Sequence, residues 1–195
     1  ETIQTLRDIA AGMHDYHEEW TGDRRAEVAT ELDLTEAELR EFDADADSFE
    51  TEIERFEHGI DVLESDPNAL RAFRLMNEVN ARQHDFPGWR LFQLVFITSN
   101  LSAVVRRERP ELGTEYDDLA DVLWFPTGGG KTEAYLGLII FSLFYDRLRG
   151  KDQGVTAWIR FPLRLLSRQQ KSRFLESLLH AEQLRRSGSE RGLDN

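Results

Sequence analysis

The amino-acid sequence predicts an α/β fold in which a partial doubly wound parallel sheet follows an acidic helical region. Three observations carry this prediction. The apolar run at 121–125 reads as a buried strand and leads through a glycine-rich loop into a helix, and a second, β-rich run at 155–161 leads into another helix. Residues 1–66 instead show helical spacing and a large excess of acidic side chains. The order strand, helix, strand, helix is how a doubly wound parallel sheet begins.

Length and composition limit the classes to which the protein can belong. Its 195 residues allow one ordinary domain, or one domain with an appendage. The chain has no cysteine, which excludes a disulfide framework and a thiolate metal site. No apolar run is long enough to span a bilayer and no signal peptide opens the sequence, so we expect a cytoplasmic protein without a membrane partner. From the residues at its ends, we expect the chain to be a piece of a longer protein.

Acidic and basic residues are distributed unevenly along the chain. Residues 1–66 contain 22 acidic and 5 basic side chains, a net charge of −17, whereas residues 67–195 contain 15 and 19, a net charge of +4. The acidic part is expected to repel nucleic acid, and the basic part can meet it. Only three of the 24 basic residues are lysines, which favours a salt-adapted surface over a functional acidic arm as the source of the acidic excess.

Within residues 1–66, apolar residues recur at helical spacing and predict helical hairpins that form an acidic arm. Thr35 precedes a stretch with acidic residues in its first turn, so it is expected to cap a helix. Asp66-Pro67 reads as the start of a further helix, because proline is favoured at the first helical position. The helical run then continues from Ala69 to Arg82.

The rest of the chain alternates between helical and extended patterns, with glycines and prolines between them. In order, the expected elements are a helix at 89–105, a strand at 122–125, a helix at 132–149, a turn at 150–154, a strand at 155–161 and a helix at 165–186.

The loop after the first predicted strand has the sequence Pro126-Thr127-Gly128-Gly129-Gly130-Lys131-Thr132. Glycines let backbone N–H groups approach phosphate oxygens, and the N-terminus of the following helix adds a positive dipole end. In such a P-loop, Lys131 is expected to reach the β- and γ-phosphates of ATP and the Thr132 hydroxyl to ligate Mg²⁺, which makes these two the candidate catalytic residues. Phe125 departs from the general pattern, which has glycine there, and so large a ring can narrow the pocket.

Two further segments resemble elements of superfamily 2 helicases. Residues 161–169 resemble the Pro-Thr-Arg-x-Leu-x-x-Gln element that contacts the nucleic-acid backbone, with Leu163 in place of the usual threonine. Residues 90–93 resemble the Arg-x-Tyr-Gln element that grips adenine, and the Gln93 amide can bond the base through both ends.

The resemblance implies two sets of contact residues beside the P-loop. ATP contacts are implied for Arg90 and Gln93. A basic cluster at Arg160, Arg168, Lys171 and Arg173 suits phosphate contacts without base readout. The nucleic-acid-binding candidates are Arg160, Arg164, Ser167, Arg168 and Gln169.

Across residues 70–175, a little over half of the chain, the sequence is similar to the helicase subunit of DISARM antiphage defence systems. This resemblance implies an ATP-driven motor directed at DNA, either single-stranded or with a single-stranded overhang, that works with other defence-system subunits. It makes residues 67–195 the N-terminal part of a RecA-like ATP-binding helicase lobe. Residues 1–66 add nothing to it.

A working motor of this kind also needs an acidic Mg²⁺-binding strand and a second lobe with an arginine finger. Nothing after Gln170 supplies either, so we expect this chain alone to bind nucleotide with little or no hydrolysis. A second hypothesis is a nucleotide-gated regulatory or scaffold module that binds a protein partner through the acidic arm. A P-loop small-molecule kinase is disfavoured by the Pro-Leu-Arg segment at 162–164.

Overall fold

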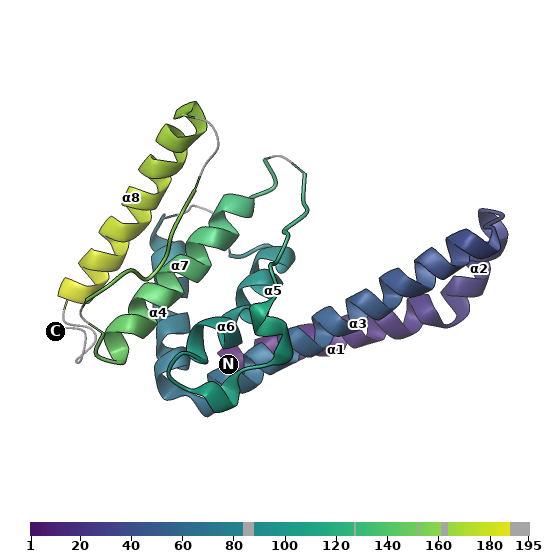
Figure 1. Ribbon diagram of the computed structural model, residues 1–195, viewed down its shortest axis with the longest axis horizontal. Coiled ribbons are helices and arrows are strands. Elements are labelled where there is room, and N and C mark those ends of the chain that lie inside the picture. Colours follow the sequence, from purple (N-terminus) through teal and green to yellow (C-terminus); the bar gives the residue numbers. More distant parts are fainter. Residues whose placement is uncertain (84–87, 127, 152, 161–163, 188–195) are drawn as a thin grey trace. The chain divides into compact units, whose positions relative to one another are not determined.

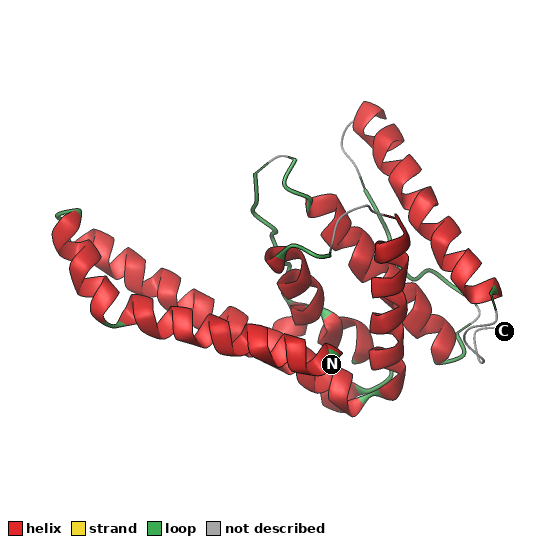
Figure 2. Cartoon of the chain, turned by 180° about the vertical axis from the view of Figure 1, so that it is seen from behind, coloured by secondary structure: helices red, strands yellow, loops and turns green. Residues whose placement is uncertain are grey.

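The computed structural model describes residues 1–83, 88–126, 128–151, 153–160 and 164–187, and of residues 164–170 it describes the backbone alone. The chain divides into two compact units, Glu1–Asp61 and Val62–Asn195. All regular secondary structure in the described ranges is helical, as Figure 1 and Figure 2 show.

The first unit contains α1 (Thr2–Thr21), α2 (Asp23–Glu31) and most of α3 (Glu36–Ser65). Helices α1 and α3 run antiparallel, as the contacts between the start of α1 and the end of α3 show. Arg7 forms an ion pair with Asp61 at 2.5 Å. Further along, the Tyr16 and Phe49 rings meet edge to face with their centroids 5.8 Å apart. The helical hairpin predicted for this part of the sequence is therefore confirmed.

Thr35 caps α3, as its sequence position predicts. Its hydroxyl oxygen accepts a hydrogen bond from the Glu38 backbone N–H (3.3 Å), while its own backbone N–H donates to Glu38 Oε2 (2.8 Å). This reciprocal pair satisfies two backbone donors that a helix N-terminus leaves unpaired. The Thr35 backbone N–H and the Thr35 hydroxyl both donate to the Glu38 carboxylate, and these two hydrogen bonds hold its pKa below the usual value.

The second unit is a cluster of helices around α7. Its helices are α4 (Pro67–Gln83), α5 (Leu91–Ser99), α6 (Leu101–Val105), α7 (Lys131–Leu148) and α8 (Arg164–Arg186), with short 3₁₀ turns at Pro110–Leu112 and Glu115–Asp118. Helix α7 packs against α4, α5, α6 and α8, and α4 also packs against α8 (Figure 1). Phe73, Met76 and Phe141 are among the fully buried side chains of this core. The predicted helix starts at Pro67 and near Thr132 are confirmed.

The predicted parallel sheet is wrong. Residues 122–125 and 155–160 form no strand, and the described ranges contain none. Trp124 is 92% exposed and Trp158 is 86% exposed, so neither run is the buried strand that its apolar sequence indicates. An extended run becomes a strand only when a neighbouring strand satisfies its backbone N–H and C=O groups. Neither run has such a neighbour within the described part of the chain, and the unit is built by helix packing instead.

Gly137 lies at the closest approach between α7 and α5. A Cβ added to it would come 2.6 Å from Ile97 Cδ1 and 2.8 Å from the Trp89 ring. Ile97 is fully buried, and the Trp89 indole N–H donates to Asn77 Oδ1 at 2.6 Å, so neither neighbour has free room to move. The absence of a side chain at position 137 therefore sets the spacing of these helices.

Replacing Gly137 with alanine is expected to lower the free energy of unfolding by about 1–3 kcal/mol, because overpacking outweighs the gain in helix propensity. Urea unfolding followed by circular dichroism measures the change. Gly12→Ala in α1 is the matched control, since nothing lies within 4 Å of the added Cβ. That variant is expected to gain about 0.5–1 kcal/mol. Equal stability changes for the two variants would contradict the packing argument.

Asp66 joins the start of α4 to α7. It is 4% exposed, and its Oδ1 accepts hydrogen bonds from the backbone N–H groups of Asn68 (2.8 Å) and Ala69 (3.3 Å). Its Oδ2 accepts the Tyr145 hydroxyl at 2.8 Å. Burial, with this hydrogen bond, raises the pKa of the Tyr145 phenol, so Tyr145 remains a donor over the whole physiological range.

Asp146 fixes the turn that follows α7. Its carboxylate accepts hydrogen bonds from Arg149 (2.6 Å), Lys151 (2.7 Å) and Thr156 (2.6 Å). Burial by itself raises the pKa of Asp146, but these three donors outweigh it and hold the pKa below its usual value. The network anchors the beginning of the run at 155–160 that precedes α8.

Candidate nucleotide-binding site

The glycine-rich loop turns directly into α7. The Gly129 N–H donates to the Pro126 carbonyl at 3.0 Å, which closes a turn, and Gly130 is the N-cap of the helix. Gly128 and Gly130 have φ angles of +80° and +93°. This left-handed backbone is strained for any residue with a Cβ, so the glycines are required by the path of the chain. Thr127 lies outside the described residues.

Lys131 and Thr132 are the first two residues of α7, where the positive end of the helix dipole lies. The Lys131 ammonium donates to the carbonyl oxygen of Pro126 at 3.1 Å and also to that of Phe125. Its charge is thus held over the loop rather than extended into solvent. An ammonium, a hydroxyl and the unpaired N–H groups of a helix N-terminus together suit a phosphate group.

Two residues at the start of α5, the N-cap Arg90 and Gln93, contact this loop. The resemblance to helicases implies that both contact ATP. Gln93 is 5% exposed, and its Nε2 donates to the Gly130 carbonyl at 2.7 Å while its Oε1 accepts the Arg90 backbone N–H at 2.9 Å. The Arg90 guanidinium donates to the Gly129 carbonyl at 2.7 Å. Both side chains thus bind loop carbonyls, a contact that the sequence alone did not suggest. Their contact with adenine remains a prediction.

Phe125 packs back onto α5. Its ring stacks on that of Phe92 with centroids 3.9 Å apart and an angle of 15° between the planes. Gly129 lies so close to the same ring that a Cβ on it would overlap Phe125. The unusual residue at the first position of the loop therefore belongs to the packing that holds the loop against α5.

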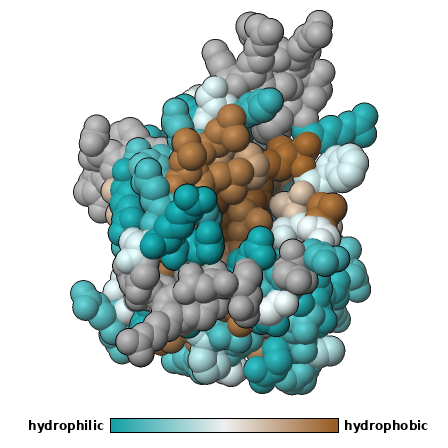
Figure 3. Space-filling model, turned by 90° about the vertical axis from the view of Figure 1, so that its left-hand side faces the viewer, coloured by the Kyte–Doolittle hydropathy of each residue, from teal (hydrophilic) through white to brown (hydrophobic). Residues whose placement is uncertain are grey.

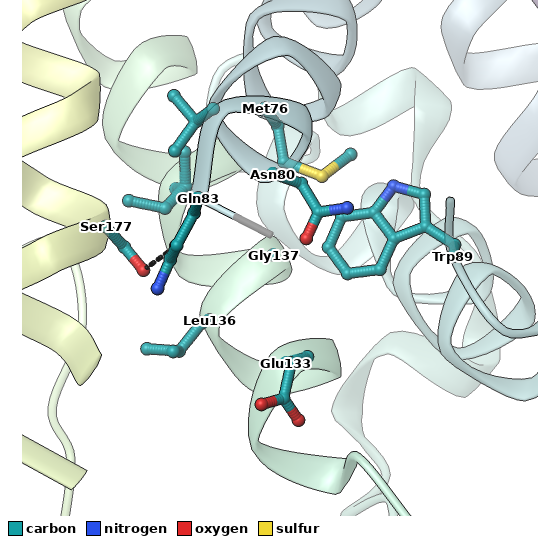
Figure 4. Close-up of a pocket in the computed structure, with 10 residues that line it drawn as sticks. Met76, Asn80, Gln83, Trp89, Glu133, Leu136, Gly137 and Ser177 are labelled. Carbon is teal, nitrogen blue, oxygen red and sulfur yellow. Dashed lines mark hydrogen bonds between the residues drawn. The ribbon is translucent and has the colours of Figure 1, made fainter. Parts of the chain in front are cut away.

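Glu133 and Arg173 form an ion pair beside the loop that sequence reasoning missed. Arg173 Nη1 of α8 donates to Glu133 Oε1 at 2.9 Å. Glu133 also lines a small cavity between α4, α7 and α8, with Gln83 and Ser177 on the opposite side (Figure 4). The sequence placed Arg173 in a basic cluster for nucleic acid, and no signal in it indicated a partner forty positions away.

The predicted nucleic-acid contacts fall mainly outside the described side chains. Arg160 is exposed just before α8. Arg164, Ser167, Arg168 and Gln169 lie in the first turns of α8, where only the backbone is described. The structure therefore leaves this nucleic-acid site a prediction.

Part of the surface is apolar. Figure 3 shows apolar atoms gathered on one face of the molecule. On α8, the side chains of Leu175 and Leu179 are 47% and 62% exposed.

No group of three or more His, Asp or Glu side chains in the described ranges is placed to hold a metal ion. Among the helices of the described chain, none has the length and apolar character needed to cross a membrane.

Comparison with known proteins relates the chain to a DISARM protein. No protein-family model matches the chain. The chain is 32% identical to the DISARM protein DrmA of Bacillus paralicheniformis in an alignment 215 residues long, and this alignment covers 95% of the chain and 18% of that protein. The chain thus spans less than a fifth of the length of this curated relative. The chain is therefore similar to part of a DISARM protein, and the matched share is too large to leave out the acidic first unit of the chain.

Proposed function

Taking this relation to a DISARM protein as the premise, we propose that the chain is the ATP-binding portion of a DNA helicase or translocase that acts in antiphage defence. The observation that carries the proposal is the loop before α7. Gly128 and Gly130 adopt the left-handed backbone that such a loop needs, and Lys131 and Thr132 follow in the first helical turn. The name of the relative supports the defence role.

In this proposal Lys131, Thr132 and the backbone N–H groups at the start of α7 have distinct parts in binding Mg-ATP. The ammonium of Lys131 leaves the carbonyls of Phe125 and Pro126 and neutralises the β- and γ-phosphates. Backbone N–H groups at the start of α7 would bind the remaining phosphate oxygens, and the Thr132 hydroxyl would ligate Mg²⁺. The bound magnesium ion would offset negative charge on the phosphates during transfer to water.

The proposed DNA contacts are Arg160 and the first turns of α8, with Arg164, Ser167, Arg168 and Gln169 against the backbone of a single strand. Positively charged and polar side chains of this kind bind phosphates independently of sequence. Other subunits of the defence system are the proposed protein partners. Without an acidic Mg²⁺-binding strand in this chain, we expect it to bind ATP and to hydrolyse little of it.

Calorimetry on the unmodified chain tests the nucleotide-binding proposal. Titration with Mg-ATP and with inorganic triphosphate is expected to give saturable binding of both, because the loop holds the phosphates that the two ligands share. Absence of binding by either ligand would contradict the proposal. Titration with labelled single-stranded DNA at two salt concentrations tests the DNA-binding part, since binding through phosphates weakens as salt rises.

The role of Gln93 is resolved by comparing the same two ligands. Gln93→Ala removes the hydrogen bond to the Gly130 carbonyl, and if this loop contact is its whole role, the change weakens Mg-ATP and triphosphate alike, by about tenfold. Gln4→Ala, an exposed glutamine of α1, is the control and should change neither. If Gln93→Ala instead weakens ATP alone, Gln93 acts on the adenine base rather than on the loop.

A further inference from the structure

A carboxylate lies directly against the proposed phosphate-binding loop. Glu133 is the third residue of α7, and its side chain is 19% exposed. Its Oε2 would be 3.4 Å from a Cβ on Gly130, so the charge lies beside the last glycine of the loop. This oxygen is buried and has no hydrogen-bond partner in the described part of the chain. A buried anionic oxygen at this position repels an incoming phosphate.

Arg173 supplies the compensating charge from another helix. Its guanidinium donates to the other carboxylate oxygen of Glu133 at 2.9 Å. The turn of α8 that carries Arg173 is held to α4, because Ser177 Oγ donates to Gln83 Oε1 at 2.6 Å (Figure 4). Gln83 Nε2 also donates to the Arg173 carbonyl at 3.4 Å. The position of Arg173 over Glu133 is therefore set by the packing of α8 on α4.

We propose that Arg173 is a positioning residue that raises the affinity of the loop for triphosphate by neutralising Glu133. The inference rests on the proposed nucleotide-binding function and adds a link between that site and α8. If α8 shifts, Arg173 moves with it and the uncompensated Glu133 charge disfavours the bound phosphates. The nucleotide site and α8 are then coupled through one ion pair, and because such coupling is reciprocal, bound triphosphate favours the position of α8 seen here.

A double-mutant cycle on the full chain tests this inference with Mg-ATP and inorganic triphosphate as ligands in calorimetry. Arg173→Ala is expected to weaken both ligands by about tenfold, because Glu133 is left unpaired beside the phosphates. Glu133→Gln removes the repelling charge and is expected to bind both at least as tightly as the unmodified chain. The double variant is expected to match Glu133→Gln, and Arg173→Lys, which keeps the positive charge, should restore most of the affinity.

Arg186→Ala is the matched control, because Arg186 is an α8 arginine paired with Glu182 of its own helix. It should bind both ligands as the unmodified chain does. Circular dichroism on each variant checks that the helices are retained. Added salt should reduce the effect of Arg173→Ala, since the Arg173 side chain is 52% exposed and salt screens its charge.

Two results would overturn the inference while leaving the nucleotide-binding proposal standing. One is unchanged affinity in Arg173→Ala. The other is a double variant as weak as Arg173→Ala, which would mean that Arg173 acts on the phosphates without Glu133. If the unmodified chain binds neither ligand, the nucleotide-binding proposal fails and this inference fails with it.

Discussion

Replacing Lys131 with alanine is expected to lower the affinity for Mg-ATP by at least about 100-fold. The ammonium is the charged donor at the start of α7, and hydrogen bonds to charged groups contribute about 1.5–3 kcal/mol each. Loss of contacts to two phosphates therefore corresponds to two or more factors of ten in the dissociation constant. Calorimetry with Mg-ATP measures the change directly.

The fold is expected to survive this substitution. Lys131 makes its hydrogen bonds to two carbonyls of its own loop and not to the helical core. Lys171→Ala provides the matched control, because Lys171 is an exposed lysine of α8. Circular dichroism should show unchanged helix content in both variants. Equal affinities for ATP in Lys131→Ala and Lys171→Ala would remove the basis for the nucleotide site.

The largest expected loss of stability follows from Asp66→Ala, at about 2.5–4 kcal/mol. The substitution removes an N-cap, worth about 1 kcal/mol. It also leaves the buried Tyr145 hydroxyl without its charged acceptor, which costs about 1.5–3 kcal/mol. Urea unfolding should show a lower midpoint with little change in slope, because the area exposed on unfolding is nearly constant.

Two variants separate the parts of this effect. Tyr145→Phe keeps the cap and removes the hydroxyl, so it should cost about 1–2 kcal/mol. Asp66→Asn keeps an acceptor for the backbone N–H groups of Asn68 and Ala69, so it should cost less than Asp66→Ala. If Asp66→Ala is no less stable than Asp66→Asn, then Asp66 does not cap α4 in solution, and if Tyr145→Phe costs nothing, Asp66 does not join α4 to α7.

Local signals in the sequence were sufficient for much of the helical structure. Thr35 was predicted to cap a helix and does so through Glu38. Proline at position 67 was predicted to open a helix, and α4 begins there. A helix was predicted to begin near Thr132, and α7 begins at Lys131. In each case the interacting groups lie within a few residues, so the sequence determines the geometry directly.

The sheet shows where this reasoning failed. The runs at 122–125 and 155–160 carry the composition of buried strands, yet Trp124 and Trp158 are largely exposed. Composition indicates only that a segment suits an extended, packed environment. Whether a neighbouring strand is present to complete the ladder depends on distant parts of the chain, and sequence pattern does not specify it.

For the candidate site, the sequence by itself determined the residue types and their order: glycines, then Lys131 and Thr132 at a helix start. Tertiary structure decided what surrounds them. It placed Gln93 against the Gly130 carbonyl and Arg173 against Glu133, contacts that join positions 37 and 40 residues apart. Such contacts are set by how α5, α7 and α8 pack, and each depends on many side chains at once. A short motif can therefore specify which residues form the loop, but not which side chains from other helices contact the loop and the Glu133 charge beside it.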